Sequence, residues 1–219
     1  MSSPDVRAQS ARQKSGATTS LMCDASASAH LAADRWEALL DEAVRLASAG
    51  GYDAVQMRVI AKHAGMAVGT LYRFVPSKNY LLAAALTRQF RRVEAGWGWT
   101  ASAATPAQRL DQLSDYLHDR WQTDPLLTEA MVKAFRVTDR TAADVVNQAA
   151  AIIEDLLART LAGGTPTVVD RRVAAVIADI WLANLTAFIG QRATAAQTRE
   201  RITEATRRIL ANLALSSTA

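Results

Sequence analysis

The chain has 219 residues, half of them hydrophobic, with a formal net charge of +4 and a single cysteine, Cys23. This length provides one sizeable core, or a small module joined to a larger one. The polar N-terminus and the short apolar runs favour neither secretion nor a membrane span, so we expect a cytoplasmic protein. One cysteine excludes an internal disulfide and a cysteine cluster, and we predict no cofactor and no metal.

Strand-like runs are scarce and alanine and leucine dominate, so the predicted fold is all-α. Residues 1–33 hold almost no large apolar side chains, and we expect a disordered tail there. Capping residues and helical spacing then predict the following helices: Asp34 to Gly50-Gly51, Met57 to Ala64, Val68 to Phe74, a long helix capped by Ser77, and five more from Thr105, Asp124, Asp139, Thr167 and Thr198.

The second and third predicted helices carry the spacing of a helix-turn-helix. Such a motif needs a small residue where its helices approach, a glycine in the turn and an apolar residue that packs back. Ala61, Gly65 and Leu71 meet these needs in order. Residues 34–92 also hold nine basic and five acidic residues, and a local basic excess favours a polyanionic partner.

The exposed positions of the motif are the candidate DNA contacts. Val68, Gly69, Thr70 and Arg73 would face the major groove, and Thr70 and Tyr72 can donate to phosphate. Lys78 begins the next helix, where its charge adds to the helix dipole, and Gln56 and Arg58 suit the flanking backbone. The competing interpretation is that Tyr72 packs half-buried and Arg73 is merely solvated.

The segment IAKHAGMAVGTLYRFVPSK, residues 60–78, resembles the TetR family of bacterial transcriptional regulators. The family's tyrosine matches Tyr72 and its Pro-Ser-Lys matches residues 76–78. Val75 departs from the pattern, because the family usually has phenylalanine there, and we expect Phe74 to fill part of that space. The resemblance implies a helix-turn-helix DNA-binding domain over residues 34–80 and a ligand-binding and dimerisation domain over residues 81–219.

Within this family, GGYDAVQMR, AVGTLYR, ATPAQRL, DPLLTEAM and ADIWLANL resemble segments of the KstR-type repressors of actinobacteria. That resemblance implies control of sterol catabolism and an effector that is a CoA thioester of a sterol-side-chain catabolite. It does not separate an orthologue from a paralogue with another inducer.

The family resemblance implies a pocket between the C-terminal helices for a hydrophobic effector. The candidate lining residues are Leu113, Leu117, Trp121, Met131, Phe135, Leu157 and Trp181. Methionine and aromatic side chains suit a large flat ligand, although each is more often plain core. The candidates for CoA phosphates are Arg109, Arg120, Lys133, Arg136 and Arg192, each of which is more often a surface charge.

The last two helices resemble the dimer interface of the family, and Ala174, Ala175, Ala178 and Ala183 permit close helix approach. A homodimer would read a palindromic double-stranded operator, because one recognition helix contacts only a few base pairs. We therefore predict a ligand-responsive repressor that leaves DNA when its effector binds. A regulator of efflux or other metabolism with another apolar or aromatic ligand is the alternative.

Two other function classes fit less well. An enzyme is disfavoured because His30, His63 and His118 are far apart and no catalytic or nucleotide-binding motif is present. A helical adaptor that binds only protein would not need the basic excess of residues 34–92.

Overall fold

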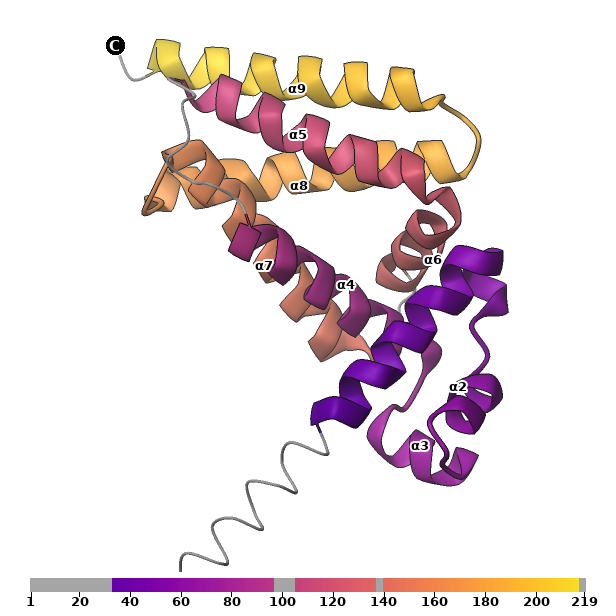
Figure 1. Ribbon diagram of the computed structural model, residues 1–219. Coiled ribbons are helices and arrows are strands. Elements are labelled where there is room, and N and C mark those ends of the chain that lie inside the picture. Colours follow the sequence, from indigo (N-terminus) through magenta and orange to yellow (C-terminus); the bar gives the residue numbers. More distant parts are fainter. Residues whose placement is uncertain (1–32, 97–104, 137–139, 217–219) are drawn as a thin grey trace, which may run out of the picture. The chain divides into compact units, whose positions relative to one another are not determined.

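The structure is a computed structural model that describes residues 33–96, 105–136 and 140–216, and all of its regular elements in these ranges are helices (Figure 1). The expected tail lies outside the described residues, apart from Ala33. By its contacts the chain divides after Leu39, within the first helix. The second unit, from Leu40 on, holds the rest of that helix and all the later ones.

The predicted helices are confirmed, most of them within a few residues of the predicted ends. The first helix covers residues 33–54. It is followed by α2 (Met57–His63), α3 (Val68–Phe74), α4 (Lys78–Gly96), α5 (Pro106–Thr123), α6 (Pro125–Arg136), α7 (Ala143–Ala162), α8 (Val168–Ile189) and α9 (Ala195–Ser216). Gly51 has the expected left-handed conformation, with φ of 70°, but the helical assignment continues to residue 54.

Side-chain caps begin several of these helices. Thr105 and Thr167 each form a reciprocal capping box, with Gln108 and with Asp170. Asp124 accepts a hydrogen bond from the backbone N–H of Leu127 at 2.9 Å and so caps α6. These bonds satisfy backbone N–H groups that have no partner inside the helix, which is why such residues mark helix starts in the sequence.

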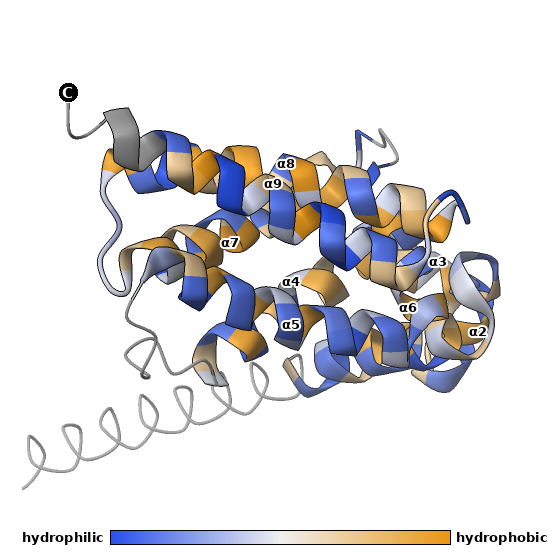
Figure 2. Ribbon diagram, turned by 90° about the horizontal axis from the view of Figure 1, so that it is seen from above, coloured by the Kyte–Doolittle hydropathy of each residue, from blue (hydrophilic) through white to orange (hydrophobic). Residues whose placement is uncertain are grey.

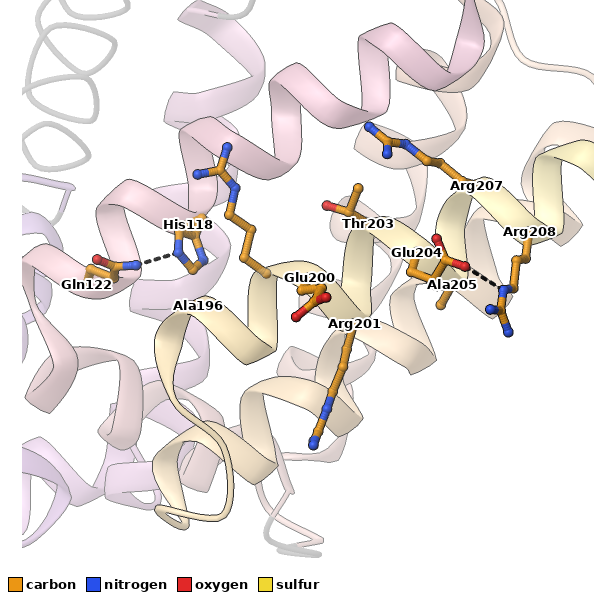
Figure 3. Close-up of a pocket in the computed structure, with 11 residues that line it drawn as sticks. His118, Gln122, Ala196, Glu200, Arg201, Thr203, Glu204, Ala205, Arg207 and Arg208 are labelled. Carbon is orange, nitrogen blue, oxygen red and sulfur yellow. Dashed lines mark hydrogen bonds and ion pairs between the residues drawn. The ribbon is translucent and has the colours of Figure 1, made fainter.

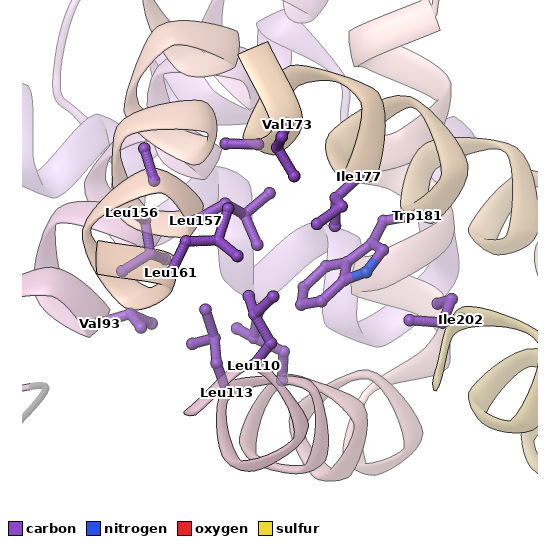
Figure 4. Packing of buried hydrophobic residues seen from close by; sticks show 13 residues of the cluster. Val93, Leu110, Leu113, Leu156, Leu157, Leu161, Val173, Ile177, Trp181 and Ile202 are labelled. Atoms are coloured by element: carbon purple, nitrogen blue, oxygen red, sulfur yellow. The ribbon is translucent and has the colours of Figure 1, made fainter. Parts of the chain in front are cut away.

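One buried cluster joins five helices of the second unit. Its residues are Val93, Leu110, Leu113, Leu117, Leu156, Leu157, Ala158, Leu161, Val173, Ala174, Ile177, Trp181 and Ile202 (Figure 4). Half-buried Trp121 meets Trp181 edge to face, with ring centroids 5.9 Å apart. Burying a side chain such as Ile177 contributes about 1.5–3 kcal/mol, so this cluster is what holds α4, α5, α7, α8 and α9 together.

Figure 2 shows blue and orange alternating along α5 and α9, as amphipathic helices require. α8 differs, because apolar residues dominate most of its length. By length and composition alone, α8 meets the criteria for a membrane-crossing helix, with a mean hydropathy of 1.6 over its most apolar window. Val168, Val169 and Val176 on α8 are exposed. This helix therefore has an apolar face that the described residues do not cover.

Candidate functional site

α2 and α3 form the predicted helix-turn-helix. Ala61 and Leu71 are fully buried, and Gly65 has φ of 63°. The turn is a Schellman motif, since the N–H of Met66 donates to the Ala61 carbonyl at 3.0 Å and the N–H of Gly65 donates to the Lys62 carbonyl at 3.2 Å. The three residues of the pattern thus have the environments that the sequence predicts for them.

α3 is buried on one side only. Leu71 is its buried residue, while Gly69, Thr70, Tyr72 and Arg73 are exposed. A Cβ added at Gly69 would meet nothing within 4 Å, so this surface is open at its centre. The exposed stretch combines an arginine, a hydroxyl and a phenol on one short helix. Such groups can donate hydrogen bonds to a phosphate backbone or to base edges.

The other predicted contact residues flank this surface. Gln56 precedes α2 and Arg58 lies in its first turn, and both are exposed, whereas Val68 at the start of α3 is half-buried. The Lys78 ammonium lies 3.7 Å from the ring centroid of Tyr52 and donates to the Tyr52 carbonyl at 3.2 Å. The structure thus holds Lys78 in one place at the start of α4.

The end of α3 corrects one expectation. Phe74 does not fill the space left by the smaller Val75, because the Phe74 side chain is 67% exposed and Val75 is fully buried. Val75 follows the last helical residue in an extended conformation, with φ of −128° and ψ of 90°. The chain therefore leaves the helix at this point, and Val75 turns into the core in place of Phe74.

A pocket of about 620 Å³ lies between α4, α5 and α6. Three of the predicted lining residues, Leu117, Trp121 and Met131, line it. The sequence did not single out the others as lining residues: Gln89, Phe90, Val93, Tyr116, Asp119, Arg120, Thr123, Asp124, Leu127 and Thr128. The spacing of Asp124, Leu127, Thr128 and Met131 along α6 was the available signal, since they share one helical face.

The structure does not bring the remaining predicted lining residues to this pocket. Leu113, Leu157 and Trp181 lie in the buried cluster, and Phe135 is half-buried at the end of α6. The pocket combines aromatic and aliphatic walls with two carboxylates and one guanidinium at its edge. Such a lining suits a mainly apolar molecule that carries a few polar groups.

Of the candidate phosphate-binding cations, only Arg120 lines the pocket. Its guanidinium donates to the Tyr116 hydroxyl at 3.2 Å. Arg109 instead donates to the carbonyl oxygens of Thr160 and Leu161 at the end of α7, at 2.7 and 2.5 Å. Lys133 is paired with Glu129 at 2.5 Å, and this hydrogen bond raises the Lys133 pKa. Arg136 and Arg192 are exposed outside the pocket.

A larger hollow of about 940 Å³ lies along α9 and the end of α5 (Figure 3). Its lining is mostly charged, with four arginines and two glutamates of α9. His118 lies in its wall, and burial, followed by the charge of Arg199, lowers the His118 pKa. The hollow is therefore open and lined mainly by charged side chains. No group of His, Cys, Asp and Glu within the described residues could hold a metal ion.

Two family models match most of the chain. The bacterial regulatory proteins of the tetR family match residues 39–85, and the tetracyclin repressor-like C-terminal domain matches residues 103–209. The first match contains α2, the turn and α3, and the second contains the pocket walls supplied by α5 and α6.

Named relatives agree with this assignment. The chain is 44% identical over 178 residues to the HTH-type transcriptional repressor KstR of Mycobacterium tuberculosis. The aligned region covers 81% of each chain. It is 41% identical over 169 residues to KstR of Rhodococcus jostii, covering 77% of this chain and 79% of the relative.

Solved structures share the fold. A TetR transcriptional regulator from Rhodococcus sp. RHA1 superposes with a TM-score of 0.72 at 24% identity, covering 82% of this chain and 97% of the other. The transcriptional regulator FadR of Bacillus subtilis, solved in complex with stearoyl-CoA, superposes with a TM-score of 0.51 at 18% identity. The match covers 77% of this chain and 96% of FadR. Together, the matched domains and these relatives show that the chain belongs to the TetR family of bacterial regulatory proteins and is a transcriptional regulator, not an enzyme.

Proposed function

We propose that this protein is a ligand-responsive transcriptional repressor that binds a palindromic operator as a homodimer and is released by a hydrophobic effector. The observation that carries the proposal is the α2–α3 motif, with its left-handed glycine turn and its exposed α3 surface. The relatives named KstR are repressors, and they match this chain across both the motif and the pocket-bearing helices.

In this proposal, α3 enters the major groove. Val68, Gly69, Thr70 and Arg73 approach the bases, and Tyr72 donates to phosphate. Gln56 and Arg58 contact the flanking backbone. Lys78 contributes its charge from a fixed position beside Tyr52 at the start of α4.

DNA recognition is tested by selecting operator fragments with the wild-type protein and measuring affinity by gel shift. Arg73→Ala and Tyr72→Ala should each weaken binding, and Arg73→Ala should also reduce the salt dependence if the guanidinium contacts phosphate. Arg91→Ala, which removes an exposed arginine of α4, serves as the matched control. Unchanged affinity in both α3 variants would refute the assignment of α3 as the recognition helix.

We assign the effector to the pocket between α4, α5 and α6. Leu117, Trp121 and Met131 provide the apolar walls, and Arg120 at the edge is placed to meet a phosphate group. A sterol-derived or acyl-CoA thioester combines a large apolar part with phosphates. The FadR structure with stearoyl-CoA indicates that this fold can hold such a molecule.

Two neighbouring leucines of α6 give a matched test of this pocket. Leu127 lines it, whereas Leu126 is exposed and lies outside it. We expect the CoA thioester of a cholesterol-derived side-chain acid to raise the melting temperature of the wild-type protein and of Leu126→Ala. The shift should be smaller for Leu127→Ala, and free CoA should give none. Equal shifts in both variants would place the ligand elsewhere.

The pocket edge also favours a second candidate, a regulator of efflux or other metabolism that answers to an aromatic ligand. Asp119 and Asp124 place two carboxylates beside the aromatic walls, and these repel phosphates but attract a cation. Ethidium, an aromatic cation, is a suitable probe in the same melting experiment. A shift with ethidium and none with either sterol-acid or stearoyl-CoA would favour this candidate over the first.

A further inference from the structure

We propose that the hydrogen bond between Ser48 and Asp124 couples the pocket to the helix-turn-helix, with Asp124 acting as a positioning residue. The inference rests on the proposed function and specifies the contact that regulates the same pocket. Ser48 Oγ donates to Asp124 Oδ2 at 2.5 Å, a short and partly buried bond between segments 76 positions apart in the chain.

Asp124 occupies the corner between α5 and α6. Its backbone N–H donates to the Arg120 carbonyl at the end of α5, and its second carboxylate oxygen accepts from the Leu127 N–H at the start of α6. Its carbonyl also accepts from the Thr128 hydroxyl at 2.9 Å. Asp124, Leu127 and Thr128 all line the pocket. Any ligand that displaces this corner therefore also moves the carboxylate that holds Ser48.

Ser48 is on the first helix, outside the pocket lining. That helix ends at residue 54, and α2 begins at Met57, so only two residues separate them. Val55 in this connection is 1% exposed and packs in the core. A shift of the first helix at Ser48 is therefore passed to α2 through this short connection.

α6 meets the first helix again in its second turn, at Glu129. Gly51 lies so close to Glu129 that an added Cβ would come within 2.8 Å of Glu129 Oε2. Glu129 holds Lys133, whose ammonium lies 6.0 Å from the Tyr52 ring centroid. The Tyr52 hydroxyl in turn donates to Asn79 at 2.6 Å. The Glu129 and Lys133 contacts align α6 with the first helix, and the Tyr52 bond links that helix to α4. Ser48–Asp124 is the hydrogen bond next to the pocket.

A contact of this kind couples two sites because each ligand changes the stability of the same bond. An effector that favours a displaced α5–α6 corner weakens the Ser48 bond, and DNA that favours one position of the first helix strengthens it. Reciprocity then requires that DNA binding stabilise the first turn of α6. This consequence is measurable without knowing the effector.

Hydrogen exchange followed by mass spectrometry tests the inference, using full-length protein and operator DNA selected by the wild-type protein. DNA should slow exchange of the α6 amides at Leu127 and Thr128 by about fivefold, the effect expected of one hydrogen bond. In Ser48→Ala this slowing should be lost, while α2 and α3 amides remain protected by DNA. Thr165→Ala, which also removes a hydroxyl but at an exposed position outside the pocket lining, should behave like the wild type.

The outcomes separate this inference from the proposed function. Protection of α2 and α3 by DNA without any slowing in α6 would overturn the coupling and leave the repressor intact. Equal slowing of α6 in Ser48→Ala and wild type would also overturn it. Failure of the wild-type protein to bind any DNA would contradict the repressor itself, and the coupling with it.

Discussion

At the residue scale, several charged side chains have structural roles that their residue type does not reveal. From the sequence, Arg109 is a candidate for binding CoA phosphates, yet its guanidinium donates to two carbonyl oxygens at the end of α7. It also lies against Gly163, where an added Cβ would come within 2.9 Å of the Arg109 Cζ. A cation at a helix C-terminus interacts favourably with the helix dipole, so Arg109 stabilises the junction of α5 and α7.

Replacing Arg109 by methionine keeps an apolar stem and removes both hydrogen bonds. We expect the free energy of unfolding to fall by about 1.5–3 kcal/mol, as for hydrogen bonds to charged groups. Urea denaturation at fixed protein concentration measures this change. Gln112→Met, on an exposed position of the same helix, should change the stability little. Equal stability of Arg109→Met and Gln112→Met would contradict the proposed role of Arg109 in stabilising the end of α7.

His118 makes stability depend on pH. Burial is the largest cause of its lowered pKa, and Arg199 acts in the same direction against the smaller opposing effects of Asp119 and Asp115. Because the folded-state pKa lies below that of the unfolded chain, the unfolded chain binds more protons. Stability should therefore fall as pH falls below the ordinary histidine pKa of about 6.5.

Melting temperatures of the wild type and of His118→Gln between pH 7.5 and pH 5.5 check this dependence. As the pH is lowered over this range, the melting temperature should fall further for the wild type than for the variant, because glutamine does not titrate. Parallel curves for the two proteins would show that His118 does not control this pH range.

The sequence predicted the residues that form the helix-turn-helix, because Ala61, Gly65 and Leu71 each answer a local steric need. It did not predict the exchange of Phe74 and Val75. Helical periodicity assigns a face to each residue only while the helix lasts, and Val75 lies just past its end. Which side chain turns inward there depends on the path of the chain into Pro76.

At the element scale, helix limits were the most predictable feature and pocket membership the least. Four helices are capped by the residue that was expected to begin them: Ser77, Thr105, Asp124 and Thr167. α7 begins at Ala143 and not at Asp139, and residues 137–139 lie outside the described residues. The division into domains at residue 80 remains a prediction.

Leu113 and Leu117 show why the pocket could not be fully predicted. Both are buried and occupy neighbouring turns of α5, yet only Leu117 lines the pocket between α4, α5 and α6. Periodicity identifies the buried face of a helix, but whether a neighbouring helix fills the space opposite depends on tertiary packing. The same argument applies to Leu157 and Trp181 in the buried cluster.

The capping box of α8 offers a test at this scale. The Thr167 hydroxyl accepts from the Asp170 N–H at 3.2 Å, while the Asp170 carboxylate accepts from the Thr167 N–H at 2.7 Å. Thr167→Ala should lower the free energy of unfolding by about 1 kcal/mol. Thr165→Ala, at an exposed position outside the capping box, should lower the free energy of unfolding by less in the same urea titration. A larger cost at Thr165 would contradict the role of this cap.

At the scale of the whole molecule, the exposed apolar face of α8 is the feature that a monomer explains least well. Val168, Val169 and Val176 are exposed, and Val176 is 51% exposed. Together with the small Ala183, this face permits close packing against a second copy, as the proposed homodimer requires. The proposed homodimer would also account for the membrane-like composition of α8, since an interface helix is apolar on more than its core side.

Val176→Arg tests this interface. The side chain is half-exposed, so the substitution should leave the folded monomer stable, but a charge on the proposed interface should dissociate the dimer. Sedimentation velocity measures the result, and Ala95→Arg at an exposed position of α4 is the control. We expect a monomer that binds the palindromic operator far more weakly. An undisturbed dimer would move the interface away from this face of α8.

The most direct test of the central claim is the dissociation constant for the selected operator, measured by fluorescence anisotropy with and without a saturating CoA thioester of a cholesterol-derived side-chain acid. We predict weaker operator binding in its presence by about 5- to 150-fold, the usual range of allosteric coupling. Free CoA should have no effect, and the salt concentration must be the same in every measurement. An operator affinity that is unchanged by sterol-acid CoA, stearoyl-CoA and ethidium alike would contradict the account of this protein as an effector-released repressor.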